Sequence, residues 1–158
     1  PLMLAAQGYQ ESQLNQEARS HVGAIGVMQI MPATGAELKV GDIRITEANI
    51  HGGTKYLDRL MTKYFPDANF SEGNRPLFAF AAYNAGPGNI SKMRRLAAQR
   101  GLDPDKWFNN VEIVTAEKIG IETTTYVRNI YKYYAAYRLT LEHEQLRQEM
   151  KEQIKKGS

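Results

Sequence analysis

Apolar residues recur along almost the whole chain three or four positions apart, which is the spacing of an α-helix. Near the end of the chain they fall at Tyr126, Ile130, Tyr133, Tyr137 and Leu141. No stretch alternates β-branched and polar residues in the way a half-exposed strand does. The pattern therefore predicts an all-α protein in which any strands are few and short.

Glycine and proline divide this pattern into separate helices. We expect helices over residues 2–12, 32–38, 50–64, 77–84, 89–100 and from 122 onward. The stretches 15–31 and 65–75 are predicted to be loops, and 40–46 a connector. The segment 103–120 has no pattern that separates helix from loop.

The first helix has apolar residues all around its circumference, which predicts that it is buried. Glu11 lies at its end, on the same side as Leu4 and Gly8. Burial disfavours a charged carboxylate and raises its pKa, so Glu11 could hold a proton near neutral pH and act as a general acid. The alternative is that Glu11 merely ends the helix at the surface.

Two further motifs carry polar groups in apolar surroundings. The run Gly26 to Pro32 holds one amide, Gln29, which can both donate to and accept from a sugar hydroxyl. Tyr83 and Asn84 place a hydroxyl and an amide at the end of another apolar helix. Each motif has an ordinary structural explanation, as core methionines in the first case and helix-capping residues in the second.

Taken in order, these motifs resemble the lysozyme-like catalytic domain of the soluble-lytic-transglycosylase (SLT) family. The resemblance rests on Glu-Ser at 11–12, Ser20 with Gly-Ala at 23–24, Gly-Val-Met-Gln-Ile-Met-Pro-Ala-Thr at 26–34, Ala-Tyr-Asn-Ala-Gly at 82–86, and Glu-Thr with Tyr-Val at 122–127. It implies a lysozyme-like helical domain with an active-site cleft over residues 1–141, followed by a charged helical tail over 142–158. The likeness extends in a general way to the membrane-bound F-type members.

The resemblance also implies a peptidoglycan lytic transglycosylase. Glu11 would protonate the glycosidic oxygen of the β-1,4 bond between N-acetylmuramic acid and N-acetylglucosamine, then take the proton of the C6 hydroxyl, leaving 1,6-anhydromuramoyl ends. Ser20 and Gln29 would orient the sugar and Met28 would form part of the floor. The substrate-binding residues implied in addition are Tyr83, Asn84, Tyr126 and Glu112.

The chain departs from the family pattern around Glu112. The family has an acidic residue a few positions ahead of the Glu-Thr pair, whereas nine residues, 113–121, separate Glu112 from Glu122 here. Thr124 and Thr125 stand where relatives often carry Arg-Gly.

The count of acids close to Glu11 in the sequence favours a reaction that uses one carboxylate. Ordinary glycosidases need two acids, and Glu17 is the only acid between Ser12 and Ala36. Asp42, Glu47 or Glu112 could still approach Glu11 in three dimensions. A hydrolytic muramidase of lysozyme type and a non-catalytic peptidoglycan-binding module therefore remain alternatives.

The composition of the chain further narrows the possible classes of protein and of binding partner. The 158 residues match one domain, the net charge of +3 is too small to indicate nucleic acid, and no apolar run reaches the length of a membrane span. The chain has no cysteine, and its three histidines show no metal-binding spacing. We expect no cofactor and no metal, peptidoglycan as the partner, and a monomer.

The start of the sequence suggests where the protein works. The chain begins at Pro1 with neither an initiator methionine nor a signal peptide, which suggests a segment of a longer precursor. We expect it in the periplasm or cell envelope, where the full-length protein would meet a membrane only through parts absent here.

Overall fold

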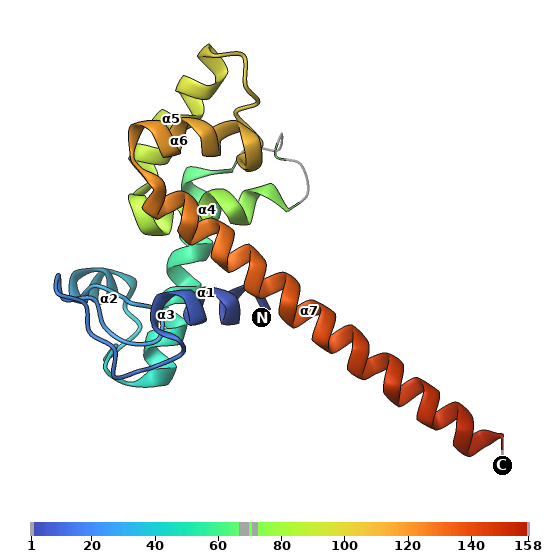
Figure 1. Cartoon of the computed structure of the whole chain (residues 1–158). Helices are drawn as coiled ribbons and strands as arrows, with labels where there is room; N and C mark the ends of the chain where they lie inside the picture. The colour runs from blue at the N-terminus through green and yellow to red at the C-terminus, as the bar shows by residue number, and fades with distance from the viewer. Residues whose placement is uncertain (1, 67–69, 71–72, 158) are drawn as a thin grey trace.

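The computed structural model describes residues 2–66, 70 and 73–157, and over this part of the chain it is helical with no extended strand (Figure 1). Two isolated β-bridges, Arg19 with Ile25 and Ile25 with Ile30, lie in the first long loop. The all-α class predicted from the spacing of apolar residues is confirmed.

The helices are α1 (Leu2–Ser12), α2 (Pro32–Leu38), α3 (Thr46–Arg59), the π-turn η1 (Leu60–Tyr64), α4 (Asn74–Ala85), α5 (Pro87–Gln99), the π-turn η2 (Trp107–Val111), α6 (Glu112–Lys118) and α7 (Ile121–Lys156). The unassigned segment 103–120 thus contains η2 and α6. Helix α4 begins two residues before Pro76, which is tolerated there because the first-turn N–H groups of a helix have no partner within it. Of the loop expected over 65–75, residues 67–69 and 71–72 lie outside the described residues.

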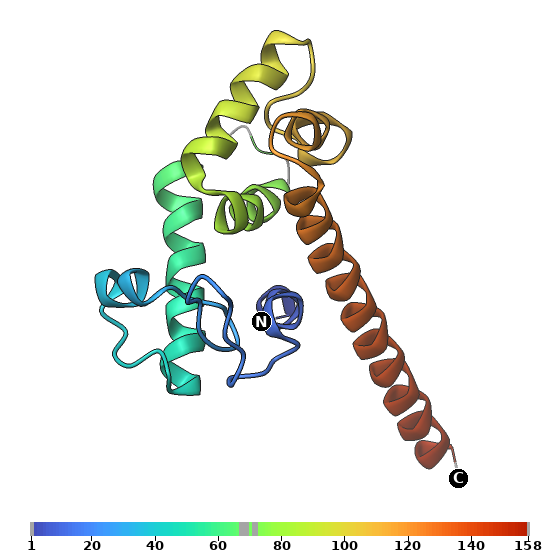
Figure 2. The ribbon, with the colours of Figure 1, turned by 60° about the vertical axis from the view of Figure 1, so that its left-hand side comes forward.

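Two apolar clusters of different size hold the structure together. The larger one joins α4, α5, α6, η2 and the first half of α7 to single buried residues of α1, α3 and η1. It includes Trp107 and Phe78, which are fully buried with their rings edge to face at 5.7 Å. The smaller cluster consists of Val27, Met28, Ile30 and Ile43. Helix α1 packs against α7, and Figures 1 and 2 show α1 between α7 and the loop that carries most of the smaller cluster.

Helix α1 is less buried than its composition predicts. Only Ala6, Gln7 and Gly8 are buried, while Leu2 through Ala5 are partly exposed. The reason is its position, because α7 and the loop after α1 cover it on some sides only. Glu11, near the end of α1, is consequently half-buried beside α7.

The loop between α1 and α2 takes its shape from a buried amide on α3. Asn49 donates from Nδ2 to the carbonyls of Ile25 and Ile43, at 2.8 and 2.9 Å, and its Oδ1 accepts from the N–H of Met28 at 2.9 Å. The neighbouring Ile50 is exposed although it is apolar, whereas the polar Asn49 is buried. One amide therefore fixes two points of this loop and, through Ile43, one point of the connector between α2 and α3.

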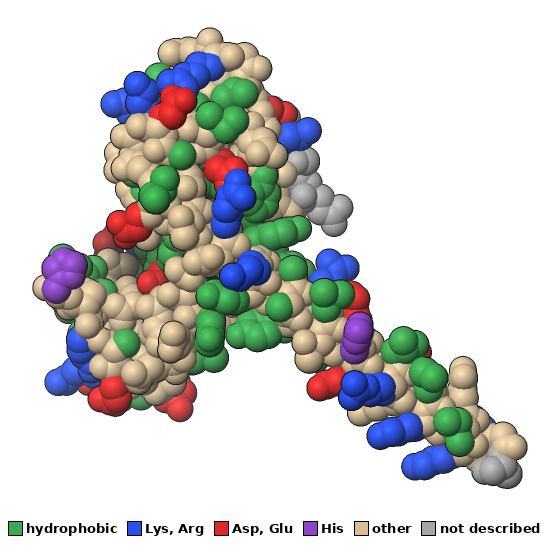
Figure 3. Space-filling model, in the orientation of Figure 1, with side chains coloured by type: hydrophobic (Ala, Val, Ile, Leu, Met, Phe, Trp, Pro, Cys, Tyr) green, Lys and Arg blue, Asp and Glu red, His purple; other side chains and the backbone are tan. Residues whose placement is uncertain are grey.

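Helix α7 continues far beyond the core. Its first half packs through Tyr126, Val127 and Ile130, whereas every residue from 138 to 157 is exposed. Figures 1 and 3 show this second half projecting away from the rest of the molecule as a single straight helix.

Candidate active site

The carboxyl group of Glu11 is held by a residue from the other end of the chain. The hydroxyl of Tyr126, on α7, donates to Glu11 Oε1 at 2.5 Å. The same hydroxyl accepts from Gln7 Nε2 at 3.1 Å, and the Gln7 side chain is fully buried one turn before Glu11. Helices α1 and α7 thus meet in a short chain of hydrogen bonds that ends on the carboxyl group.

Burial of Glu11 shifts its titration into the neutral range. Loss of solvent raises the pKa of Glu11 from 4.5 to about 7, and the hydrogen bond from Tyr126 opposes part of that rise. No other carboxylate of the described residues is among the groups that shift this pKa. A large share of Glu11 therefore carries a proton at neutral pH, as a general acid requires.

Tyr83 approaches the same carboxyl from α4. Burial, and after it the charge of Glu11, raises the pKa of Tyr83 well above its ordinary value. Its hydroxyl donates to the carbonyl of Met28 at 2.7 Å, which ties the loop to α4. Met28 itself is buried, and its side chain lies in the space next to Gly8 and Gly53.

Ser20 and Gln29 stabilise the turns of the loop. Ser20 Oγ accepts from the N–H of Ala24 at 2.9 Å, and Gln29 Nε2 donates to the carbonyl of Gly26 at 2.9 Å. Both side chains are partly exposed. The backbone of Gln29 has φ 49°, an unusual conformation that the bond to Gly26 helps to hold.

Asn84 is exposed next to Tyr83 and links α4 to α7. Its Oδ1 accepts from the hydroxyl of Thr123 at 2.7 Å. The structure thus gathers Glu11, Tyr126, Tyr83 and Met28 by direct contact or charge, and it connects Asn84 to them through α4 and α7. Figure 3 shows the surface indented between the upper helices and the lower lobe.

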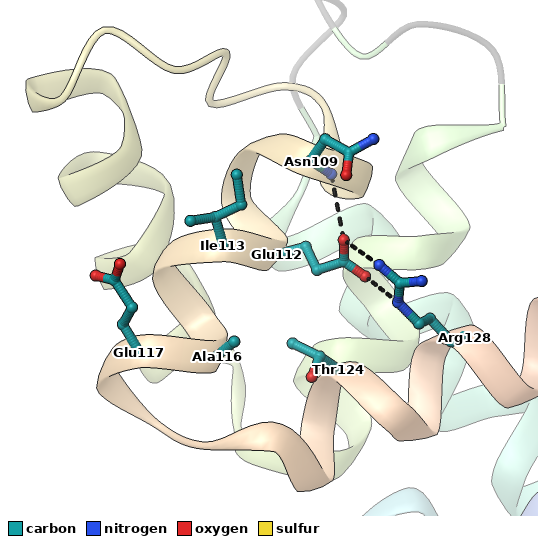
Figure 4. A pocket seen from close by; sticks show the side chains of 7 residues that line it. All are labelled: Asn109, Glu112, Ile113, Ala116, Glu117, Thr124 and Arg128. Carbon is teal, nitrogen blue, oxygen red and sulfur yellow. Dashed lines mark hydrogen bonds and ion pairs between the residues drawn. The ribbon is translucent and has the colours of Figure 1, made fainter.

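Glu112 lies apart from this cluster. Its carboxylate accepts from Arg128 Nε at 2.8 Å and from a terminal nitrogen of the same guanidinium at 3.0 Å, beside a pocket shown in Figure 4. Arg128 and Tyr126 are two positions apart on α7, which turns their side chains about 200° from each other. The pair therefore lies on the side of α7 opposite Glu11, and the structure does not bring Glu112 to the predicted site.

The two other acids considered as partners of Glu11 lie on other segments, and neither is among the groups that shift the pKa of Glu11. Asp42 pairs with Arg44 at 2.9 Å on the surface, and Glu47 lies in the first turn of α3. The described residues contain no group of three His, Asp or Glu side chains that could hold a metal ion. Within the same residues no helix has the length and hydrophobicity to cross a membrane.

Sequence reasoning missed Gln7 as a member of the site and Asn49 as its support. Gln7 did carry a signal, because every other residue from Leu2 to Tyr9 of this helix is apolar, aromatic or glycine. A polar side chain retained in such a place is expected to have a buried partner. Nothing in the sequence near Asn49 indicates its three bonds, which reach residues up to 24 positions away.

Comparison with known proteins gives a consistent set of similarities. The model of the family "Transglycosylase SLT domain" matches residues 1–106. Membrane-bound lytic murein transglycosylase F of Vibrio cholerae serotype O1 is 35% identical over 157 residues, covering 91% of this chain and 29% of that protein. The protein of the same name from Aeromonas hydrophila is 33% identical, with 90% and 31% covered. The chain thus spans less than a third of the length of these relatives.

Two solved structures share the fold. The 70 kDa soluble lytic transglycosylase of Escherichia coli superposes with a TM-score of 0.67 at 30% identity, covering 89% of this chain and 22% of that one. Lytic transglycosylase Slt of Pseudomonas aeruginosa, solved as an inactive mutant in which a glutamate is replaced by glutamine, gives a TM-score of 0.66 at 29% identity, with the same coverage.

Proposed function

Because this chain belongs to the transglycosylase SLT domain family, we propose that it is the catalytic part of a peptidoglycan lytic transglycosylase. The observation that carries the proposal is a single carboxyl group, Glu11, whose pKa lies at about 7. A two-acid hydrolase needs a second carboxylate near the scissile bond. One acid that can give up a proton and take another at neutral pH suits the transglycosylase reaction instead.

In the proposed reaction Glu11 acts twice. Its proton passes to the glycosidic oxygen as the bond to the anomeric carbon of N-acetylmuramic acid breaks, and the substrate's acetamido group stabilises the positive charge left there. The Glu11 carboxylate then takes the proton of the C6 hydroxyl while that oxygen bonds to the anomeric carbon. The product carries a 1,6-anhydro ring, no water is consumed, and Glu11 is protonated again.

The surrounding residues are proposed to bind and orient. Tyr126 and Gln7 hold the carboxyl group, and Tyr83 with Met28 fixes the loop beneath the substrate. Ser20 and Gln29 would present polar groups to the sugar from that loop. Asn84 would bind the substrate at the end of α4, whereas Glu112 would bind it only from outside the Glu11 cluster.

The setting of the enzyme is part of the same proposal. The substrate is peptidoglycan glycan strands and muropeptides, and the location is the periplasm or cell envelope, in keeping with the membrane-bound relatives. The catalytic unit is proposed to comprise residues 1–141, with its active site complete within one copy of the chain and 142–158 as an appended charged tail.

Mass spectrometry of the products of purified peptidoglycan tests the reaction. We expect 1,6-anhydromuramoyl ends, and reducing muramic acid ends would show a hydrolase instead. Glu11→Gln is expected to abolish cleavage while folding and sugar binding persist. The matched control is Glu17→Gln, which changes an exposed acid of the neighbouring loop and should leave the rate unchanged. Binding without cleavage by the unmodified chain would indicate a peptidoglycan-binding module.

A further inference from the structure

The projecting half of α7 carries an apolar stripe that no described residue covers. Leu139, Leu146, Met150 and Ile154 are 57, 57, 55 and 72% exposed. Figure 3 shows hydrophobic side chains along this part of the helix, with Lys and Arg side chains gathered beside them. Large apolar residues repeated along a helix in solvent mark a contact surface.

The stripe is narrow and faces away from the core. At about 100° per residue its four members fall within about 80° around the helix axis, which is the width of a coiled-coil seam and not of a helix laid on a core. Leu139 is nine positions after the buried Ile130, so the two side chains point about 180° apart. A second helix could therefore lie on the stripe without meeting the catalytic part of the same chain.

In a heptad repeat Leu139 and Leu146 occupy d positions and Met150 an a position, while His143 and Gln153 take the remaining a and d positions and Ile154 lies beside the seam at e. Glu142 then falls at g and Arg147 at e. In a parallel pair of helices, g of one chain lies near the e position five residues later in its partner, which brings opposite charges together. An antiparallel pair would set e against e and g against g, which opposes like charges.

The charges along the projecting half of α7 argue against a membrane surface as the partner of the stripe. Glu142 accepts from Arg138 of its own chain at 3.2 Å but its side chain stays 54% exposed, so it can also meet an incoming arginine. Residues 142–157 hold four basic and four acidic side chains. A segment with no net charge gains little from an anionic lipid surface.

We propose that residues 139–154 pair with the same segment of a second copy as a parallel two-stranded coiled coil. This pairing goes beyond the catalytic proposal and does not depend on it, and it differs from the monomer expected from the sequence. A parallel pair holds both catalytic parts at one end of the stalk. Two active sites on one assembly would bind a polymeric glycan more tightly than one, through their raised effective concentration.

Sedimentation equilibrium over a range of concentrations tests the pairing. The 17.8 kDa chain is expected to form a reversible dimer, and the double variant Leu146→Gln with Met150→Gln should raise the dimer Kd at least about tenfold. The matched control is Leu141→Gln, an exposed leucine off the stripe, which should leave Kd unchanged. A chain that stays monomeric at every concentration overturns the proposal, as does a monomer that cosediments with phosphatidylglycerol vesicles.

The orientation has its own test, because the chain contains no cysteine and any cysteine introduced is unique. Gln153→Cys lies at a d position of the seam, so a parallel dimer should oxidise to a disulfide-linked pair. Gln148→Cys, on the opposite side of the helix, should not. Glu142→Arg should weaken the dimer and Arg147→Glu added to it should restore it; equal cross-linking of the two cysteine variants would refute the parallel seam.

Discussion

At the scale of single residues, Glu11 combines burial with one strong hydrogen bond. Loss of solvent disfavours its charge more than the bond from Tyr126 favours it, and the result is a pKa of about 7. Tyr126 is itself buried, and burial together with the charge of Glu11 raises the pKa of its hydroxyl well above the ordinary value. The phenol therefore stays protonated and remains a donor throughout the range in which Glu11 titrates.

The raised pKa of Glu11 predicts how stability depends on pH. Between about pH 4.5 and pH 7 the folded protein binds more protons at this site than the unfolded chain, so the free energy of unfolding falls as pH rises through that window. The variant Glu11→Gln does not show this fall in the free energy of unfolding, because a glutamine side chain does not titrate. Its stability relative to the unmodified protein should grow across the window, by up to about 3 kcal/mol, and stay constant outside it. Urea denaturation at several pH values measures this, and a pH-independent difference would contradict it.

Tyr126→Phe should move the pH profile of the reaction. The hydrogen bond from Tyr126 lowers the pKa of Glu11, so its loss should shift the descending limb of kcat from near pH 7 to higher pH, while the rate falls because the carboxyl group loses its orientation. Tyr131→Phe, an exposed tyrosine of the same helix, is the control. A rate that drops equally at all pH values, with the limb unmoved, would show a purely structural role.

At the scale of elements, α3 supports the site through the residues that it holds in place. Asn49 holds the loop before α2 by two hydrogen bonds and the connector after α2 by a third, and Gly53 lets the helix approach Met28 closely. A Cβ at Gly53 would lie 2.6 Å from Met28 Cγ and 2.7 Å from Met28 Cβ, far inside ordinary contact. The floor of the predicted site therefore depends on a glycine one helix away from it.

Gly53→Ala is expected to destabilise the protein by about 1–3 kcal/mol, because Met28 must leave its place in a packed core. It should lower activity as well, since Tyr83 is bonded to the carbonyl of the same methionine. Gly88→Ala in α5 is the matched control, for no atom lies within 4 Å of its added Cβ, and its stability should be equal or slightly higher. Thermal denaturation of both variants tests this prediction. Equal melting temperatures would contradict the close approach of Gly53 to Met28.

The pair of Glu112 and Arg128 joins α6 to α7 on the far side of the latter helix. Glu112 is nearly buried, with its side chain 6% exposed, whereas that of Arg128 is 62% exposed. The geometry shows a strap between two helices, and α7 is the helix that presents Tyr126 to Glu11. Glu112 thus has a structural part in positioning α7 whatever its part in binding substrate.

At the scale of the whole molecule, the catalytic part and the tail share one helix but not one core. All the described residues that a chain ending at Leu141 loses, 142–157, are exposed. Its melting temperature should therefore fall by no more than about 3 °C, and its cleavage of short muropeptides should persist. Circular dichroism measures the melting temperature, and the product assay measures the cleavage. Loss of folding would place the domain boundary further along the chain, and the same truncation should abolish dimer formation.

The sequence alone determined most of the helices and their order, although it left η2 and α6 inside the unassigned segment 103–120. Pro32 and Leu38 bound α2 as predicted, and Gly86 with φ 92° separates α4 from α5 before Pro87. These boundaries depend on backbone sterics and on neighbours within a few positions, which a sequence displays directly. The ordered motifs likewise sufficed to identify the family that the comparisons show.

Only the tertiary structure decided which side chains meet. Glu11 and Tyr126 are 115 positions apart, and Tyr83 and Met28 are 55 apart, so neither contact follows from local pattern. Packing also set Glu112 on the wrong side of α7 for the predicted site and turned Asn49, not Ile50, inward. Helix formation is governed by adjacent residues, but the pKa of a carboxyl group is governed by everything packed around it, and that is fixed only when the whole chain has folded.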